Sequence, residues 1–336
     1  MSLSSVGDLR QHFVTSRNIA DLKTDLGTLV EELTTGEVSD LTAHLGAGQT
    51  QLVGIDRQLA MLAQFSQSNV ETGQILSTMQ LALANIEDHR ASSSSSLLTI
   101  NSTSSTSQIE IAALAARAGF ESTIQSLNLR SNDRSMFGGN DLDSNPLASA
   151  DEIFTALTLA TSGLTEAEDI SAAIDDWFTS PGGGFDTVGY QGDSNGFLER
   201  PLSTGQSVEI GIRANDDALR DTLKAFAIAA IAGDVDSELA IETRRTLQVK
   251  SGEDLLSVAS PLAGLQGRLG YIESQVEEAS TRNASLETSF GIARNTLVSA
   301  DPFETATRLQ EVQLQLETQY SLTARLSRLS LTEYLR

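Results

Sequence analysis

The sequence predicts a mainly α-helical protein, with long antiparallel coiled-coil helices from both chain ends and a small α+β insert in the middle. Three observations predict this fold class. Apolar residues follow a heptad repeat over residues 258–300, a similar repeat occupies residues 49–90, and turn-forming residues are concentrated over residues 135–213. A sustained heptad repeat keeps facing a partner helix only if the two helices supercoil around each other.

The C-terminal repeat is the more regular of the two. Its members are apolar or small except for the polar Asn283, and they are Val258, Leu262, Leu265, Leu269, Ile272, Val276, Ala279, Asn283, Leu286, Phe290, Ala293, Leu297 and Ala300. We predict one long helix over these residues, with the helix at residues 49–90 as its partner in the same chain.

A second C-terminal helix is predicted to begin at Asp301. Asp301 can cap it, Pro302 suits its first position, and Glu304 stands where the reciprocal acid of a capping box belongs. The apolar residues between Phe303 and Leu335 spread around more than one face. A helix that is apolar on several sides at a chain end needs several neighbours, so we expect it to pack against other subunits.

The N-terminal half begins with a predicted helix over residues 1–34. The sequence Thr34-Thr35-Gly36 ends this helix, and residues 37–48 are expected to form a loop. The next helix has apolar residues at heptad spacing, namely Leu52, Ile55, Leu59, Leu62, Leu76, Met79, Leu83 and Ile86. The serine run Ser92–Ser96 is expected to interrupt or loosen it.

The middle of the chain combines short elements with turns. Thr165 and Glu168 have the spacing of a capping box at the start of one short helix. The predicted elements are helices over residues 107–131, 150–161, 165–178, 217–233 and 234–248, and a strand over residues 207–212.

The predicted organisation has four parts. They are an N-terminal helix and loop (1–48), a helical coiled-coil domain (49–134 with 214–300), an outer α+β lobe (135–213) and a C-terminal subunit-packing helix (301–336).

The composition argues against several classes of partner. The chain has 336 residues and a formal net charge of −23, with 45 acidic residues against 22 basic ones. Nucleic acids and anionic membrane surfaces require clustered basic residues, so neither is an expected partner. The chain has no cysteine, no apolar run long enough to span a bilayer and no pattern typical of a cleaved signal peptide.

No residue pattern points to catalysis, and we expect neither an enzyme nor a cofactor. The three histidines, His12, His44 and His89, lack the spacing of a metal pair. Asp141, Asp143, Asn145 and Glu152 have the spacing of calcium-loop ligands, but Pro146 occupies the position that needs glycine. The prediction is a plain polar loop, with no catalytic, cofactor or metal residues.

The two chain ends resemble those of the flagellin family. At the C-terminus the resemblance is carried by Asp301–Leu309, Gln313–Glu317 and Leu326–Leu335, whose ending is most similar to that of the hook-associated proteins at the hook-filament junction. At the N-terminus it is carried by Arg17-Asn18-Ile19 and by Leu33–Glu37, where Glu37 replaces a basic residue usual in the family.

Two turns in the middle extend the resemblance. Met136–Pro146 is similar to a Phe-(Gly/Ser/Ala)-Gly…Asp…Pro turn of the junction proteins, and Tyr190–Asp193 resembles the start of their β lobe. The resemblance implies an extracellular flagellar protein, exported through the flagellar secretion channel without a cleaved signal. It also implies chain ends that pair as a coiled coil and pack against neighbouring subunits.

The leading hypothesis is a structural adaptor that joins hook to filament through terminal helices that order on assembly. The expected partners are copies of itself, a neighbouring hook-associated protein, flagellin subunits and an export chaperone. A filament flagellin is the alternative, and a secreted helical effector or binding protein is a more remote one. The predicted subunit-packing residues are Phe13, Leu22, Leu26, Leu29, Leu309, Val312, Leu316, Tyr320, Leu326, Leu329 and Leu331.

Overall fold

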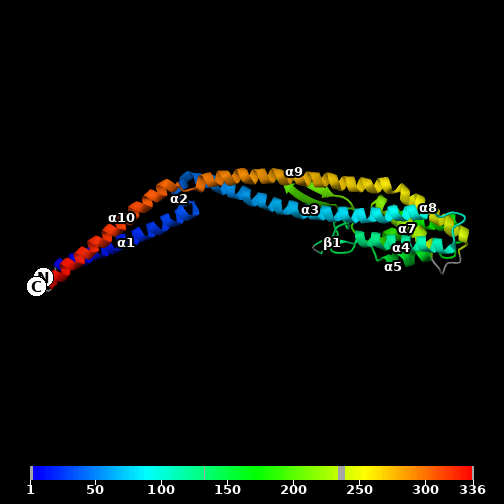
Figure 1. Ribbon diagram of the computed structural model, residues 1–336, viewed down its shortest axis with the longest axis horizontal. Helices are drawn as coiled ribbons and strands as arrows, with labels where there is room; N and C mark the ends of the chain where they lie inside the picture. The colour runs from blue at the N-terminus through cyan, green and yellow to red at the C-terminus, as the bar shows by residue number, and fades with distance from the viewer. Residues whose placement is uncertain (1–2, 132, 234–238, 335–336) are drawn as a thin grey trace. The chain divides into compact units, whose positions relative to one another are not determined.

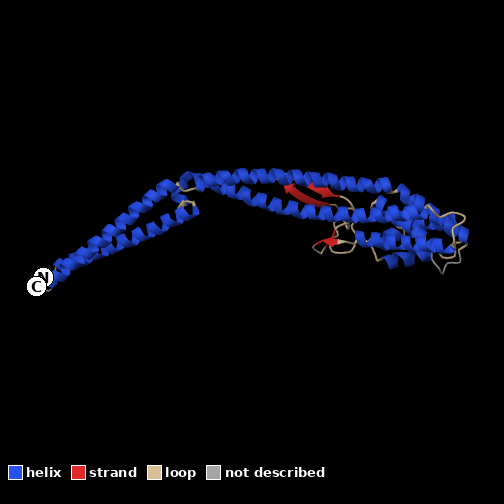
Figure 2. Ribbon diagram, in the orientation of Figure 1, coloured by secondary structure: helices blue, strands red, loops and turns tan. Residues whose placement is uncertain are grey.

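The protein is mainly helical, as the computed structural model shows for residues 3–131, 133–233 and 239–334, with side chains described except at residues 3–9, 11 and 326–334. The helices are α1 (Leu3–Thr35), α2 (Leu41–Leu45), η1 (Gly46–Gly48), α3 (Gln49–Leu97), α4 (Thr106–Leu127), α5 (Ala150–Ala160), α6 (Ala167–Thr179), η2 (Phe185–Gly189), α7 (Asp217–Ala232), α8 (Ile241–Ser257), α9 (Ala259–Val298) and α10 (Pro302–Tyr334). The strands form two small antiparallel pairs, β1 (Arg130–Ser131) with β2 (Arg134–Ser135) and β3 (Leu198–Ser203) with β4 (Gln206–Ile210) (Figures 1 and 2). The predicted fold class is confirmed.

The chain forms two compact units. The terminal unit consists of Met1–Ala63 and Ala284–Arg336, and the central unit of Gln64–Asn283. The long helices α3 and α9 contribute residues to both units. The four-part organisation inferred from the sequence divides the chain by expected role, and it stays a prediction.

In the central unit, α3 and α9 run antiparallel (Figure 1), and most of their predicted heptad positions in this unit are buried. Gln80 Nε2 of α3 donates to the Gln266 carbonyl of α9 at 2.9 Å. The buried heptad positions are Leu76, Met79, Leu83 and Ile86 of α3 and Leu262, Leu265, Leu269, Val276 and Ala279 of α9. The heptad prediction is therefore confirmed for these residues.

The serine run does not interrupt α3, so this prediction was wrong. Ser93 and Ser94 are buried, and Ser94 Oγ donates to the Gly252 carbonyl of α8 at 2.8 Å. A Cβ added at Gly252 would lie 3.1 Å from Leu97 Cβ. The small serines and Gly252 let α3 and α8 approach closely, and a neighbouring carbonyl satisfies the Ser94 hydroxyl.

A break at Val258 separates α8 from α9. Pro261 lacks an N–H to continue the helical hydrogen bonds, and such a residue inside a helix breaks or kinks it. The buried guanidinium of Arg90 donates from Nη1 to the Leu255 carbonyl at 2.9 Å, just before the break. The helix predicted over residues 234–248 is observed as α8, which begins at Ile241, while residues 234–238 lie outside the described residues.

Helix α7 is the centre of the core of this unit. Its residues from Ala225 to Ala232 are all buried, and α4, α6 and α8 pack around it. Gly119 of α4 makes room for Phe226, because a Cβ at Gly119 would lie 2.5 Å from Phe226 Cε1. This close approach explains a glycine in the interior of α4, where its helix propensity is poor.

The short helices are capped, but not all as predicted. Ser149 with Glu152 forms a complete capping box at α5, and Ser105 with Gln108 forms another at α4. The box predicted from Thr165 and Glu168 is absent, because α6 begins at Ala167 and its N-cap residue makes no side-chain cap. The predicted strand is present as β4.

Polar side chains from two helices hold the β3–β4 hairpin. Asn69 Nδ2 of α3 and Asn283 Nδ2 of α9 both donate to the carbonyl of Leu202, at 3.3 Å and 2.8 Å. Ser68 Oγ donates to the carbonyl of the preceding residue, Pro201, at 3.0 Å. The single polar member of the C-terminal heptad repeat therefore binds a strand rather than facing an apolar partner.

The substitution Asn283→Leu is expected to loosen the hairpin with little change in stability. Asn283 Oδ1 is buried without a partner, so leucine removes an unsatisfied acceptor together with the donor. We expect the free energy of unfolding to change by less than about 1 kcal/mol, while hydrogen exchange at the amides of β3 and β4 becomes faster. The control Asn295→Leu, at an exposed position of α9, is expected to change neither quantity.

Candidate subunit-packing surface

The terminal helices pack against each other through a heptad seam. In the terminal unit α1 and α10 lie side by side and antiparallel, with Lys23 Nζ 5.9 Å from the centre of the Tyr320 ring (Figure 1). Leu29 and Leu316 are buried, at 6% and 8% exposure. The half-buried apolar residues of the seam are Ile19, Leu22, Leu26, Leu309 and Val312. The seam covers one stripe of each helix and leaves the other faces open.

Large apolar side chains occupy the uncovered faces. Phe303 is 82% exposed, Phe13 is 73% exposed and Leu314 is 65% exposed. We call the exposed apolar residues of α1 and α10 the outer apolar residues, and they are Phe13, Val14, Val30, Leu33, Phe303, Leu314, Tyr320 and Leu322. Apolar exposure of this extent on paired helices is typical of a surface that another protein covers.

The predicted subunit-packing residues divide into groups. Leu22, Leu26, Leu29, Leu309, Val312 and Leu316 line the seam within the chain. Phe13 and Tyr320 belong to the outer apolar residues. The side chains of Leu326, Leu329 and Leu331 lie outside the described part of α10. The subunit-packing role of the whole set stays a prediction.

The selection from sequence missed Phe303 and Leu314, which are among the most exposed apolar residues of α10. These two residues are separated by about three helical turns, so they share one face of the helix. Leu314 and Leu316, two positions apart, point to nearly opposite sides. Assigning α10 residues to one seam by helical spacing would have shown that Phe303 and Leu314 lie off it.

A short backbone bridge ties the segment that follows α1 to the segment that leads into α10. We call residues 36–38 and 298–300 the bridge segment, in which Glu37 and Ser299 form an antiparallel β-bridge. Val38 N donates to the Val298 carbonyl at 2.8 Å, and Ala300 N donates to the Gly36 carbonyl at 2.9 Å. Gly36 has a φ of +72°, a conformation that glycine adopts without strain and that ends α1.

Arg294 adds ion pairs beside the bridge segment. Its Nη1 donates to Glu37 Oε1 at 2.9 Å and its Nε donates to Asp56 Oδ1 at 3.1 Å. The hydrogen bond to Glu37 raises the pKa of the Arg294 guanidinium. Asp301 caps α10 by accepting from Phe303 N at 2.9 Å and Glu304 N at 3.2 Å, so the Asp301 half of the predicted capping box is formed.

The two turns that resemble the junction proteins contact each other in the central unit. Asp193 N donates to the Gly138 carbonyl at 2.9 Å, and Leu147 and Tyr190 form a β-bridge. Burial raises the pKa of the Tyr190 phenol to about 12, and its hydroxyl donates to the Asp193 carbonyl at 3.0 Å. Hydrogen bonds among their own polar groups therefore hold the two turns together.

The residues with calcium-loop spacing have structural partners. Asp141 accepts hydrogen bonds from Asp143 N, Ser144 N and Ser144 Oγ, and the Ser144 hydroxyl is the main cause of its lowered pKa. Glu152 completes the α5 capping box, accepting from Ser149 N and Oγ. Across the described residues, no group of histidines and acidic side chains is arranged to hold a metal ion.

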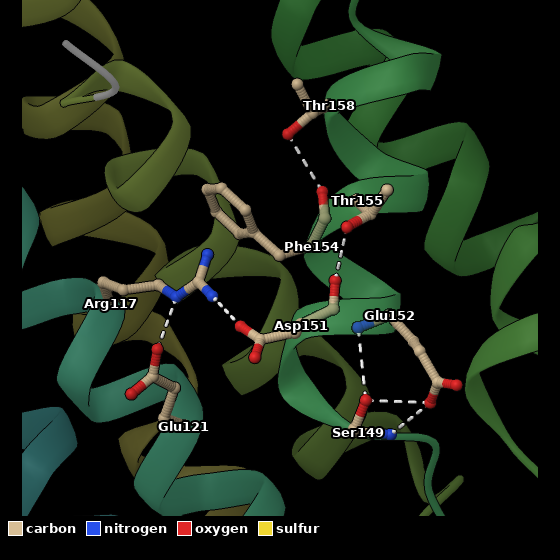
Figure 3. Close-up of polar contacts among 8 residues, drawn as sticks. All are labelled: Arg117, Glu121, Ser149, Asp151, Glu152, Phe154, Thr155 and Thr158. Carbon is tan, nitrogen blue, oxygen red and sulfur yellow. Dashed lines mark hydrogen bonds and ion pairs between the residues drawn. The ribbon is translucent and has the colours of Figure 1, made fainter. Parts of the chain in front are cut away.

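A charged cluster between α4 and α5 was not foreseen from the sequence. Arg117 Nε donates to Glu121 Oε1 at 2.6 Å and its Nη2 to Asp151 Oδ1 at 2.7 Å, while its guanidinium lies 3.8 Å from the centre of the Phe154 ring (Figure 3). The cation is thus occupied by two carboxylates and an aromatic face. Such a cluster joins two helices.

The described helices include none that is long and apolar enough to cross a membrane. The candidate site consists of the seam, the outer apolar residues and the bridge segment. Exposed apolar side chains on paired helices suit association with other proteins.

Comparisons with known proteins agree with this view. Residues 257–335 match the family described as the bacterial flagellin C-terminal helical region. The fold is similar to that of a structure described as a putative flagellar hook-associated protein from Vibrio parahaemolyticus, with 11% identity, a TM-score of 0.52, and coverage of 74% of this chain and 97% of that chain. Bacillus cereus FlgL is also similar, with 12% identity, a TM-score of 0.46, and coverage of 67% of this chain and 98% of that chain. No curated protein sequence matches the chain.

The fold is thus similar to that of a flagellar hook-associated protein. The family matched over residues 257–335 is a structural one, in agreement with the prediction that the chain is not an enzyme. The match over α9 and α10 is to the flagellin family, and it agrees with the resemblance noted at the C-terminal end of the chain. This part of the chain is thus similar to the C-terminal helical region of bacterial flagellins.

Proposed function

We propose that the protein is an adaptor that joins the hook to the filament of a bacterial flagellum. Its terminal helices order on assembly and pack against copies of itself, a neighbouring hook-associated protein and flagellin subunits. It reaches the outside of the cell through the flagellar export channel, without a cleaved signal and with the help of an export chaperone.

The outer apolar residues are the observation that carries the proposal. They lie on helices that bury only one stripe against each other, and isolated helix pairs of this kind gain most of their stability from further packing. Neighbouring subunits that cover Phe13, Phe303 and Leu314 would supply that packing. The similarity in fold to a hook-associated protein favours the junction among flagellar positions.

Leu314→Asp is expected to block assembly without harming the monomer. Leu314 faces away from the seam, so a carboxylate there is solvated in the monomer and becomes buried only when a second subunit covers it. We expect the concentration needed for self-association to rise at least about tenfold, with helix content unchanged. Analytical ultracentrifugation and circular dichroism measure the two quantities, and swimming of cells that produce the variant measures function.

Two further variants sharpen this test. Gln315→Asp adds the same charge at an exposed polar position and is expected to leave assembly near the wild-type level. Leu316→Asp, two residues from Leu314, places the charge in the seam and is expected to prevent α1 and α10 from pairing on assembly, and so to block assembly as well. Normal motility and association of Leu314→Asp would contradict the proposal.

The alternatives differ in what the purified protein does alone. Long filaments formed without other components would favour a filament flagellin. Terminal helices that resist proteolysis in the free monomer would favour a secreted helical protein that needs no assembly.

A further inference from the structure

The ion pairs of Arg294 join three chain segments that are distant in sequence. Arg294 lies one turn before the end of α9, Glu37 lies in the bridge segment after α1, and Asp56 lies near the start of α3. All three belong to the terminal unit. Each carboxylate receives a different N–H of the same guanidinium, Nη1 for Glu37 and Nε for Asp56.

We propose that Arg294 is the positioning residue that locks the bridge segment, and so fixes the register in which the chain leaves α1 and enters α10. The backbone of the bridge segment offers only two hydrogen bonds across the two segments, Val38 to Val298 and Ala300 to Gly36. So short a ladder is marginal in water. A guanidinium fork that binds Glu37 on one side and Asp56 on the other restricts the bridge segment to one register on α3 and α9.

The geometry explains why arginine is needed. Its rigid planar head presents separate N–H groups in fixed directions, so two carboxylates on different segments are held at one angle to each other. A lysine ammonium carries the same charge without the fixed directions. Arg294→Lys is therefore expected to retain only part of the effect.

This inference goes beyond the proposed function and concerns the free monomer, so it does not depend on assembly. The test is hydrogen exchange at the amides of Val38 and Ala300, whose hydrogen bonds form the bridge segment. In Arg294→Ala we expect exchange at both amides to become about fivefold faster, an effect in the range of two partly exposed ion pairs. Exchange at Leu83, buried in the central unit, is expected to stay unchanged.

Matched variants separate locking from a general loss of charge. Arg57→Ala removes the same charge next to Asp56, from a residue with no ion pair to any described residue, and is expected to leave both amides protected. Arg294→Lys is expected to give an intermediate exchange rate. The double variant Glu37→Arg with Arg294→Glu restores one pair with reversed charges and is expected to recover protection above that of Arg294→Glu alone.

Three results would overturn the inference. They are unprotected amides at Val38 and Ala300 in the wild-type monomer, equal exchange in Arg294→Ala and Arg57→Ala, and equal exchange in Arg294→Lys and the wild type. None of them bears on the assembly of Leu314→Asp, so the proposed function is tested separately.

Discussion

Phe226→Ala is expected to destabilise the central unit by about 3–5 kcal/mol, the usual cost of removing a fully buried phenylalanine. Phe226 lies in α7, the helix around which α4, α6 and α8 pack, and none of its surface is exposed. The ring occupies the space left by Gly119, so a cavity would open between two helices that cannot easily collapse. Stability of most domains is only about 5–15 kcal/mol, so this loss would unfold a large fraction of the molecules near physiological temperature.

Urea denaturation followed by the fluorescence of Trp177 measures this effect. Trp177 is the single tryptophan of the chain and is buried in the central unit beside Phe178 and Phe185, so its signal reports on that unit. The control is Phe303→Ala, the same substitution at an exposed position, with an expected change within about 0.5 kcal/mol. A loss below about 1 kcal/mol in Phe226→Ala would mean that α7 is not the packing centre.

The sequence was sufficient to predict the long helices of the central unit. The heptad positions of α3 from Leu76 to Ile86 are buried, and so are those of α9 from Leu262 to Ala279 except the partly buried Ile272, because a heptad repeat constrains which side chains meet. The serine run misled the prediction. Serine favours turns when the sequence is considered alone. In α3, however, the serine side chains are small enough for α8 to pack closely against the helix.

Long-range polar contacts could not be predicted in this way. Arg294 and Glu37 are separated by almost the whole chain, and nothing in the spacing near either residue indicates the other. Strand β3 was missed because it contains Pro201, which counts against a strand prediction, and because its side chains lack a clear alternation. For α10, apolar residues on several faces indicated more than one neighbour, which stays a prediction, and only the fold separates the seam from the outer apolar residues.

Arg90→Met is expected to cost about 2–4 kcal/mol of the stability of the central unit. Arg90 is buried and forms a bidentate ion pair with Glu87, with both N–O distances at 2.7 Å. It also donates to the Leu255 carbonyl at 2.9 Å, where the chain leaves α8 and Pro261 prevents a regular continuation. Methionine fills similar space, but it leaves the partly buried Glu87 carboxylate and the Leu255 carbonyl without the hydrogen bonds that Arg90 donates.

The role of each Arg90 contact can be separated with Glu87. Glu87→Gln keeps the hydrogen bond from Arg90 to Leu255 and is expected to cost only about 1 kcal/mol. In Arg90→Met the Glu87 carboxylate has already lost its ion pair, so replacing it by glutamine removes no further interaction. The double variant Arg90→Met with Glu87→Gln is therefore expected to lose less stability than the sum of the single losses. If the stability lost in the double variant equals the sum of the two single losses, the ion pair contributes nothing. The cost of Arg90→Met would then come from the lost hydrogen bond at the helix break alone.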